Sequence, residues 1–107
     1  MHAYEAIEQS LTFIEEHLTK EISTEELANT VGLSTFYFQR LFKRLVNKPV
    51  QEYVKLRRLA KVIENLKSTE QRILDVALDY GFSSHANFTR AFKETYGITP
   101  EIYRRDL

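Results

Sequence analysis

The chain contains the same short pattern of residues twice, about fifty positions apart. Ala28 precedes Gly32 by four residues, and Ala77 precedes Gly81 by the same interval, so both pairs are offset by 49. Matching aromatic residues further along are offset by 50, namely Phe38 with Phe88 and Tyr53 with Tyr103. The second copy therefore contains one additional residue in its turn. A duplicated unit constrains the fold strongly, because both copies are expected to form the same structure.

Each copy has the features of a helix-turn-helix unit. The alanine lies on the inner side of a short helix, and a glycine follows where left-handed backbone can end that helix. An apolar residue comes next, and then a serine, whose hydroxyl can accept hydrogen bonds from the first N–H groups of a second helix. This pattern predicts second helices that begin at Ser34 in the first copy and at Ser83–Ser84 in the second.

The remaining sequence is also helical in pattern. Apolar residues spaced three or four apart predict a first helix over residues 3–18. The other expected helices begin near Ser23, Ser34, Pro49, Ser68–Thr69, Ser83–Ser84 and Thr99–Pro100, which are favourable residues at helix starts. We therefore expect an all-α chain of about seven helices. Residues 1–48 would form a first helix-turn-helix lobe, residues 49–67 a long connector helix, and residues 68–107 a second lobe.

Composition restricts where such a chain acts. The sequence has 107 residues, of which 43% are hydrophobic, and it contains no cysteine. The lack of cysteine excludes disulfides and thiolate metal sites and fits a reducing cytoplasm. No apolar run is long enough for a membrane span, and the N-terminus lacks the layout of a signal peptide. We expect a soluble, cytoplasmic protein without membrane contact.

Charge is distributed unevenly, although the net charge is zero. Residues 1–34 carry −6, residues 35–67 carry +7 and residues 68–107 carry −1. The basic segment, residues 35–67, covers the second helix of the first copy and the connector, where a polyanion could bind. The alternative is a solvated helix face whose charge is balanced by an acidic neighbour.

A projection at about 100° per residue separates two faces on the second helix of each copy. The expected core face carries Phe38, Leu41, Phe42 and Leu45 in the first copy and Phe88, Ala91, Phe92 and Thr95 in the second. The opposite face carries Phe36, Arg40 and Lys43, matched by Ala86, Arg90 and Lys93, with Gln39 and Thr89 at one side. Each copy therefore presents an arginine outward at an equivalent position.

The outward residues are of the types that read DNA bases. Arginine pairs bidentately with guanine and glutamine with adenine, and each good pair contributes about 1–3 kcal/mol of discrimination. Phe36 is either a packing residue near the turn or an apolar contact for a thymine methyl group or a sugar, and the neighbouring Gln39 and Arg40 favour contact. A single exposed arginine would not indicate DNA binding, but Arg40 and Arg90 at equivalent positions favour a double-stranded DNA partner.

The connector suggests how both copies could act together. A helix of about 18 residues is roughly 27 Å long, which approaches the ~34 Å repeat between successive major-groove segments on one face of DNA. The two second helices differ in sequence, so we expect a monomer to bind an asymmetric site. A conventional helix-turn-helix protein instead dimerises on a palindrome.

Other residues are candidates for contacts with DNA phosphates. The cations and one hydroxyl are Thr35, Lys43, Arg44, Lys48, Arg57, Arg58 and Lys93. Ser34, Ser83 and Ser84 could present helix N-termini to phosphate, although helix capping also explains serines at these positions. Exposed lysine and arginine are common, so each assignment is an individual hypothesis.

The sequence also bears on two other functional classes. An enzyme needs convergent acid, base, nucleophile or metal groups, but His2, His17 and His85 are scattered and no glycine-rich phosphate loop is present. We expect no enzyme activity, no metal and no cofactor. A helical protein-interaction module without DNA specificity is the alternative, because helical repeats also form partner grooves and the first helix carries several glutamates.

Two stretches resemble a known family. Residues 81–93, GFSSHANFTRAFK, and residues 97–104, with Gly97, Thr99–Pro100 and Tyr103–Arg104, are similar to the signature of the AraC/XylS transcription regulators, and the length is similar to the compact MarA/SoxS/Rob type. The resemblance covers nearly the whole chain. It implies seven helices, two helix-turn-helix lobes, promoter binding and recruitment of RNA polymerase. It also leaves room for a fused sensor or effector domain outside the chain.

Carried over by position, the resemblance implies a set of base-reading residues. They are Phe36, Gln39, Arg40, Ala86, Asn87, Thr89 and Arg90. Ala86 departs from the glutamine of the compact activators and offers only a methyl group, so Arg90 becomes the main reader of the second lobe. His85 either contacts a phosphate or base, or has a capping or packing role near the helix start.

Overall fold

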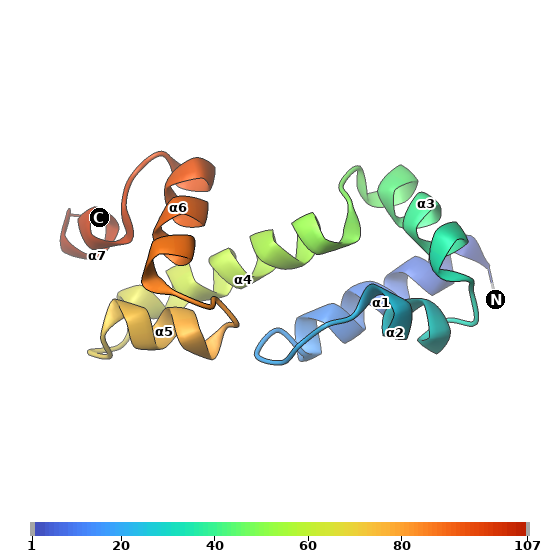
Figure 1. Cartoon of the computed structure of the whole chain (residues 1–107), viewed down its shortest axis with the longest axis horizontal. Coiled ribbons are helices and arrows are strands. Elements are labelled where there is room, and N and C mark those ends of the chain that lie inside the picture. The colour runs from blue at the N-terminus through green and yellow to red at the C-terminus, as the bar shows by residue number, and fades with distance from the viewer. Residues whose placement is uncertain (1, 107) are drawn as a thin grey trace. The chain divides into compact units, whose positions relative to one another are not determined.

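The computed structural model describes residues 2–106, and these residues form seven α-helices and no strand (Figure 1). The helices are α1 (Ala3–Glu16), α2 (Thr24–Thr30), α3 (Thr35–Val46), α4 (Val50–Leu66), α5 (Ile73–Asp79), α6 (His85–Tyr96) and α7 (Pro100–Asp106). The prediction of an all-α chain is confirmed. The chain divides into two compact units, with the boundary between Lys55 and Leu56 inside α4.

Serine hydroxyls cap the helices that follow the two turns. Ser34 Oγ accepts from the N–H of Tyr37 at 3.2 Å, and Ser84 Oγ accepts from the N–H of Asn87 at 3.1 Å. Ser83, which the sequence pattern also placed at the start of α6, does not cap the helix. Its Oγ instead accepts from the side-chain amide of Asn87.

Both turns end the preceding helix in the same way. The N–H of Leu33 donates to the carbonyl of Ala28 at 3.0 Å, and the N–H of Phe82 donates to that of Ala77 at 3.1 Å. Each hydrogen bond closes a turn that contains a glycine with positive φ, +74° at Gly32 and +86° at Gly81. These bonds are offset by 49, whereas the capping serines are offset by 50, so Ser83 is the additional residue.

The equivalence continues through the ends of the second helices. Asn47 and Gly97 both have left-handed backbone, and each N–H bonds to a carbonyl four residues earlier at 2.8 Å. The next helix begins in the same register, since Tyr53 N–H bonds to the Pro49 carbonyl and Tyr103 N–H to the Thr99 carbonyl, both at 3.0 Å. The start of α4 is therefore the counterpart of α7.

The first unit buries apolar residues from each of its helices. α1, α2 and α3 pack on one another. The buried residues are Ala6, Ile7, Ile14, Leu18, Ile22, Leu27, Ala28, Val31, Phe38, Phe42, Val50 and Val54. Gln51 ties α4 to the start of α2, because its Nε2 donates to the Ile22 carbonyl at 3.1 Å and to Thr24 Oγ1 at 2.9 Å.

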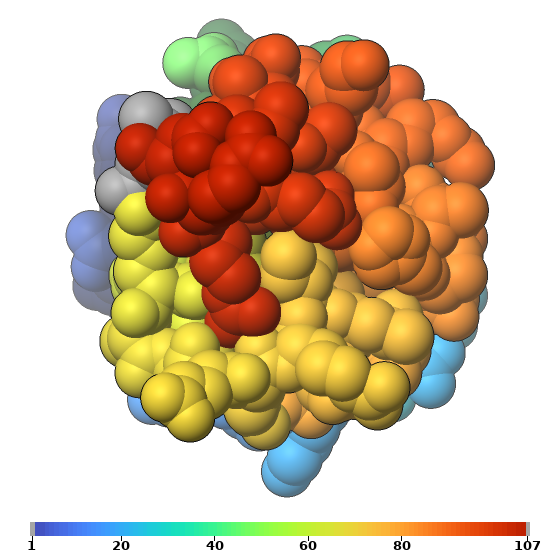
Figure 2. Space-filling model, turned by 90° about the vertical axis from the view of Figure 1, so that its left-hand side faces the viewer, coloured from blue at the N-terminus to red at the C-terminus, as the bar shows by residue number. Residues whose placement is uncertain are grey.

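The second unit has its own core beneath α5, α6 and α7. That core consists of Leu59, Val62, Leu66, Val76, Ala77, Phe88 and Phe92. Figure 2 shows α7, in red, lying against α6, in orange. Arg104 joins α7 to the end of α4, since its Nε donates to the Leu66 carbonyl at 2.6 Å and its Nη2 to the Thr69 carbonyl at 3.0 Å.

The duplication is preserved in the packing of aromatic rings. Phe42 lies between Phe38 and Tyr53, with ring centroids 5.8 and 5.6 Å apart. Phe92 lies in the same way between Phe88 and Tyr103, at 5.7 and 6.1 Å. The two units are therefore built around the same three-ring arrangement, in the tilted and edge-on geometries that aromatic pairs prefer.

Three details differ from the sequence-based expectations. α5 begins at Ile73 and not at Ser68–Thr69, because the Ser68 hydroxyl donates to the Glu64 carbonyl and Thr69 Oγ1 accepts from the Gln71 N–H, so both serve the turn after α4. Thr95 is exposed and not in the core, and its hydroxyl donates to the Ala91 carbonyl of its own helix at 2.8 Å. α1 ends at Glu16, two residues early.

Candidate nucleic-acid interface

The outward face of α3 combines an exposed aromatic ring with an arginine. Phe36 is 69% exposed, which is unusual for a phenylalanine, and Gln39 and Arg40 beside it are also exposed. The guanidinium carbon of Arg40 lies 5.5 Å from the centroid of the Phe36 ring, within the range of a cation–π contact. The ring supports the arginine from within the same helix, and the guanidinium edge remains available for hydrogen bonds.

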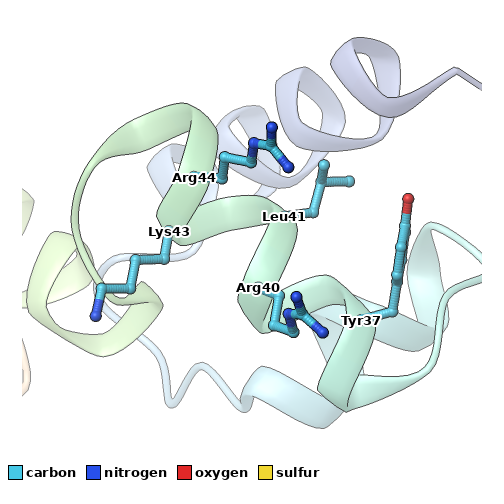
Figure 3. A pocket seen from close by; sticks show the side chains of 5 residues that line it. All are labelled: Tyr37, Arg40, Leu41, Lys43 and Arg44. Carbon is cyan, nitrogen blue, oxygen red and sulfur yellow. The ribbon is translucent and has the colours of Figure 1, made fainter.

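A shallow pocket opens on the same helix. Its lining residues are Tyr37, Arg40, Leu41, Lys43 and Arg44, and its volume is about 490 Å³ (Figure 3). Three of these five side chains are cations, so the pocket suits an anionic group. Tyr37 and Leu41 were not predicted to take part in a site. Tyr37 lies one turn before Leu41, on the side of α3 that the helical projection assigns to the core, so its exposure was not evident from the sequence.

The outward face of α6 holds its arginine by a different contact. Arg90 Nη2 donates to Asn87 Oδ1 at 3.3 Å, and Asn87 Nδ2 donates to Ser83 Oγ at 2.8 Å. All three residues are exposed. Ala86, the counterpart of Phe36, is exposed as well but has no ring to support an arginine. The two helices thus present equivalent arginines with different neighbours.

Thr89 and His85 have surroundings that the sequence did not reveal. Thr89 is half-buried, and its Oγ1 is shielded from solvent without a hydrogen-bond partner. His85 Nε2 lies 3.2 Å from Glu101 Oε2, so the imidazole contacts α7 at a point where both side chains are half exposed. In this arrangement the Thr89 hydroxyl is not on the outward face, and His85 links the start of α6 to α7.

The candidate phosphate-binding residues differ in exposure. Lys43, Arg44, Lys48 and Lys93 are exposed, whereas Thr35, Arg57 and Arg58 are half-buried. The hydroxyls of Ser34 and Ser84 are used as helix caps. Ser83 is exposed and holds Asn87.

Arg58 packs against the turn of the second unit. A Cβ added at Gly81 would lie 3.2 Å from both Cζ and Nη1 of Arg58, so the guanidinium covers the glycine. Partial burial lowers the pKa of Arg58 from its usual value, because the charged form loses hydration. The guanidinium nevertheless stays charged at any physiological pH.

Part of the positive charge of the basic segment is paired along α4. Lys55 Nζ lies 3.2 Å from Glu52 Oε2, and Lys61 Nζ lies 3.5 Å from Glu64 Oε2. Both pairs are substantially exposed and therefore weak.

Within residues 2–106, no group of histidine, cysteine, aspartate or glutamate side chains is placed to hold a metal ion. No helix in that range is long and apolar enough to cross a membrane.

Comparison with known proteins identifies the family. Residues 27–106 match a family described as "Helix-turn-helix domain". The chain is 40% identical over 104 residues to the HTH-type transcriptional regulator YbfP of Bacillus subtilis, which covers 97% of the chain and 35% of YbfP. The chain thus spans about a third of the length of that relative.

A second relative matches along its entire length. The regulatory protein SoxS of Salmonella typhimurium is 32% identical over 107 residues, which is 100% of both proteins. Among solved structures, an AraC-type transcriptional regulator from Chromobacterium violaceum superposes with a TM-score of 0.90 at 27% identity, over 94% of this chain and 90% of that one. The chain therefore belongs to the AraC/XylS family of DNA-binding helix-turn-helix transcription regulators, a family of regulators and not of enzymes.

Proposed function

We propose that the chain recognises a specific promoter sequence by placing α3 and α6 in successive major-groove segments of double-stranded DNA. The observation that carries this proposal is the pair of exposed arginines, Arg40 and Arg90, at equivalent positions of the two helices. Each is held by a side chain of its own helix, Phe36 or Asn87. A major groove admits a helix, and arginine recognises the O6 and N7 atoms of guanine.

The base-reading residues differ between the helices, which supports an asymmetric site. On α3 they are Phe36, Gln39 and Arg40, and on α6 they are Arg90, Ala86 and His85. Of the other two candidates on α6, Thr89 has its hydroxyl shielded from solvent, and Asn87 bonds to Arg90. Since one chain carries two unlike helices, we propose that a single copy binds each site. Lys43, Arg44, Lys48 and Lys93 would contact phosphates on either side of the bases, because all four are exposed cations.

The consequence of binding is proposed to be recruitment of RNA polymerase in the cytoplasm. A relative from Providencia stuartii, 35% identical over 92% of this chain, is named "HTH-type transcriptional activator AarP". That name supports activation for the present chain. Purified RNA polymerase should transcribe more from a template carrying the selected site when the protein is added, whereas an unchanged or reduced yield would contradict activation.

Selection of binding sites from random duplexes, followed by footprinting, tests the recognition proposal. We expect one asymmetric site with protection over two major-groove segments and one chain per minimal duplex. A footprint with dyad symmetry, or two chains per minimal site, would overturn it. The double variant Arg40→Ala/Arg90→Ala should fold and lose specific affinity. If the folded double variant binds the selected duplex unchanged, the arginines do not read DNA.

A further inference from the structure

Asn87 connects two other side chains of the second unit in a fixed order. Its Nδ2 donates to Ser83 Oγ at 2.8 Å, and its Oδ1 accepts from Arg90 Nη2 at 3.3 Å. Arginine can only donate, so the oxygen end of the amide has to face Arg90 and the nitrogen end has to face Ser83. The backbone of Asn87 is held as well, since its N–H bonds to Ser84 Oγ.

This relay, Ser83–Asn87–Arg90, depends on the residue that distinguishes the two copies. Ser83 is the additional residue in the second turn, and Ser84 occupies the position of the capping Ser34. Because Ser84 supplies the cap, the Ser83 hydroxyl serves the amide of Asn87 instead. The position equivalent to Asn87 in the first unit is Tyr37, which has no amide, and there Arg40 is supported by Phe36.

We propose that Asn87 is a positioning residue that holds the guanidinium of Arg90 for base contact and does not read a base itself. This proposal rests on the proposed function. Each end of the Asn87 amide already makes one hydrogen bond within the protein, so only one N–H and one oxygen lone pair are left for a base, and the bonds to Ser83 and Arg90 fix their direction. A long arginine side chain loses conformational freedom when it binds, and holding it beforehand reduces that loss.

A double-mutant cycle separates positioning from direct reading. The measured quantity is the ratio of affinities for the selected duplex and for duplexes with single base-pair changes in the segment bound by α6. Arg90→Ala should lower this ratio at one base pair by roughly tenfold. Asn87→Ala should lower it at the same base pair by roughly threefold, as expected for one supporting hydrogen bond. The double variant should equal Arg90→Ala alone.

Two further variants test the anchor of the relay. Ser83→Ala should show part of the loss of discrimination expected for Asn87→Ala. Ser83→Thr should retain discrimination, because threonine keeps the hydroxyl. The same duplexes changed in the segment bound by α3 are the internal control, since discrimination there should not move in any of these variants. All the positions are exposed, so thermal unfolding should confirm that each variant folds normally.

Each alternative outcome has a distinct meaning. If Asn87→Ala has no effect while Arg90→Ala does, positioning is wrong and base reading by Arg90 stands. If the two losses are additive, or fall on different base pairs, Asn87 reads a base directly and the proposal is overturned. If Arg90→Ala itself leaves discrimination unchanged, the proposed function fails for the second unit, and the role assigned to Asn87 fails with it.

Discussion

The guanidinium of Arg40 lies over the ring of Phe36 at 5.5 Å, four residues away on the same helix. Phe36 is 69% exposed, so it contributes little to the core, and its ring contacts a charged neighbour. This relationship explains an exposed phenylalanine on the charged side of α3. The contact also distinguishes the first unit from the second, because the residue equivalent to Phe36 in the second unit is Ala86, which has no ring.

Replacing Phe36 should weaken DNA binding more than it weakens the fold. Phe36→Ala removes an exposed cation–π contact worth about 0.5–1 kcal/mol, and titration with the selected duplex should show a loss of similar size. Phe36→Trp should retain or increase affinity because tryptophan gives a stronger cation–π contact. A loss of thermal stability with unchanged DNA affinity would indicate a packing role instead.

Arg40→Ala should reduce specific affinity by about 1–3 kcal/mol, as expected for the loss of one bidentate base contact. The free energy of unfolding should change by less than about 0.5 kcal/mol, since Arg40 is exposed. Arg40→Lys keeps the charge but not the planar fork, so it should retain non-specific affinity and lose discrimination. Full discrimination by Arg40→Lys would show that only the charge matters.

Salt should weaken binding steeply if the cations of α3 meet phosphates. The slope of log affinity against log salt is about −0.9 for each phosphate neutralised, so Lys43→Ala should make the slope shallower by about one. Arg72→Ala is the matched control, because Arg72 is an exposed cation paired with Asp75 outside the basic segment. Equal changes in slope for the two variants would argue against a localised phosphate contact by Lys43.

Arg104 should matter for stability and Arg105 should not. Arg104 donates to two carbonyls, those of Leu66 and Thr69, and hydrogen bonds to charged groups contribute about 1.5–3 kcal/mol each. Arg104→Ala should therefore destabilise the second unit by about 2 kcal/mol or more in denaturant unfolding. Arg105 is exposed and contacts its neighbour Asp106, so Arg105→Ala should have almost no effect. If Arg104→Ala and Arg105→Ala lower the free energy of unfolding by similar amounts, the two carbonyl contacts of Arg104 contribute little to stability.

Gly81→Ala should cost more stability than Gly97→Ala. Both glycines have positive φ, +86° and +79°, so each substitution carries the backbone penalty of about 1–2 kcal/mol. Only at Gly81 would the new Cβ meet another group, the Arg58 guanidinium at 3.2 Å. Denaturant unfolding should show an excess cost for Gly81→Ala, and Arg58→Ala should remove that excess. An excess that persists without Arg58 would point to the backbone alone.

Much of the fold follows from local signals. Ser34 and Ser84 cap α3 and α6 because a hydroxyl at a helix start satisfies an otherwise unpaired N–H, and this needs no distant partner. The error at α5 has the same origin. Ser68 and Thr69 resemble capping residues, but their hydroxyls bond within the turn that follows α4.

The site was predictable in part for the same reason. Arg40 and Arg90 face outward by helical periodicity alone, and the Ser83–Asn87–Arg90 relay has the three- and four-residue spacing of neighbours on a helix. The buried hydroxyl of Thr89 was not predictable, because shielding of one atom depends on how neighbouring side chains pack.

The duplication, the helix starts at the two turns and the outward arginines can all be derived from the amino-acid sequence, because each depends on residues within a few positions of one another. Three contacts became apparent only in the folded chain: His85 lies against Glu101, Arg104 binds the end of α4, and Arg58 covers Gly81. These contacts join residues 16 to 38 positions apart, so they exist only after packing has brought separate helices together.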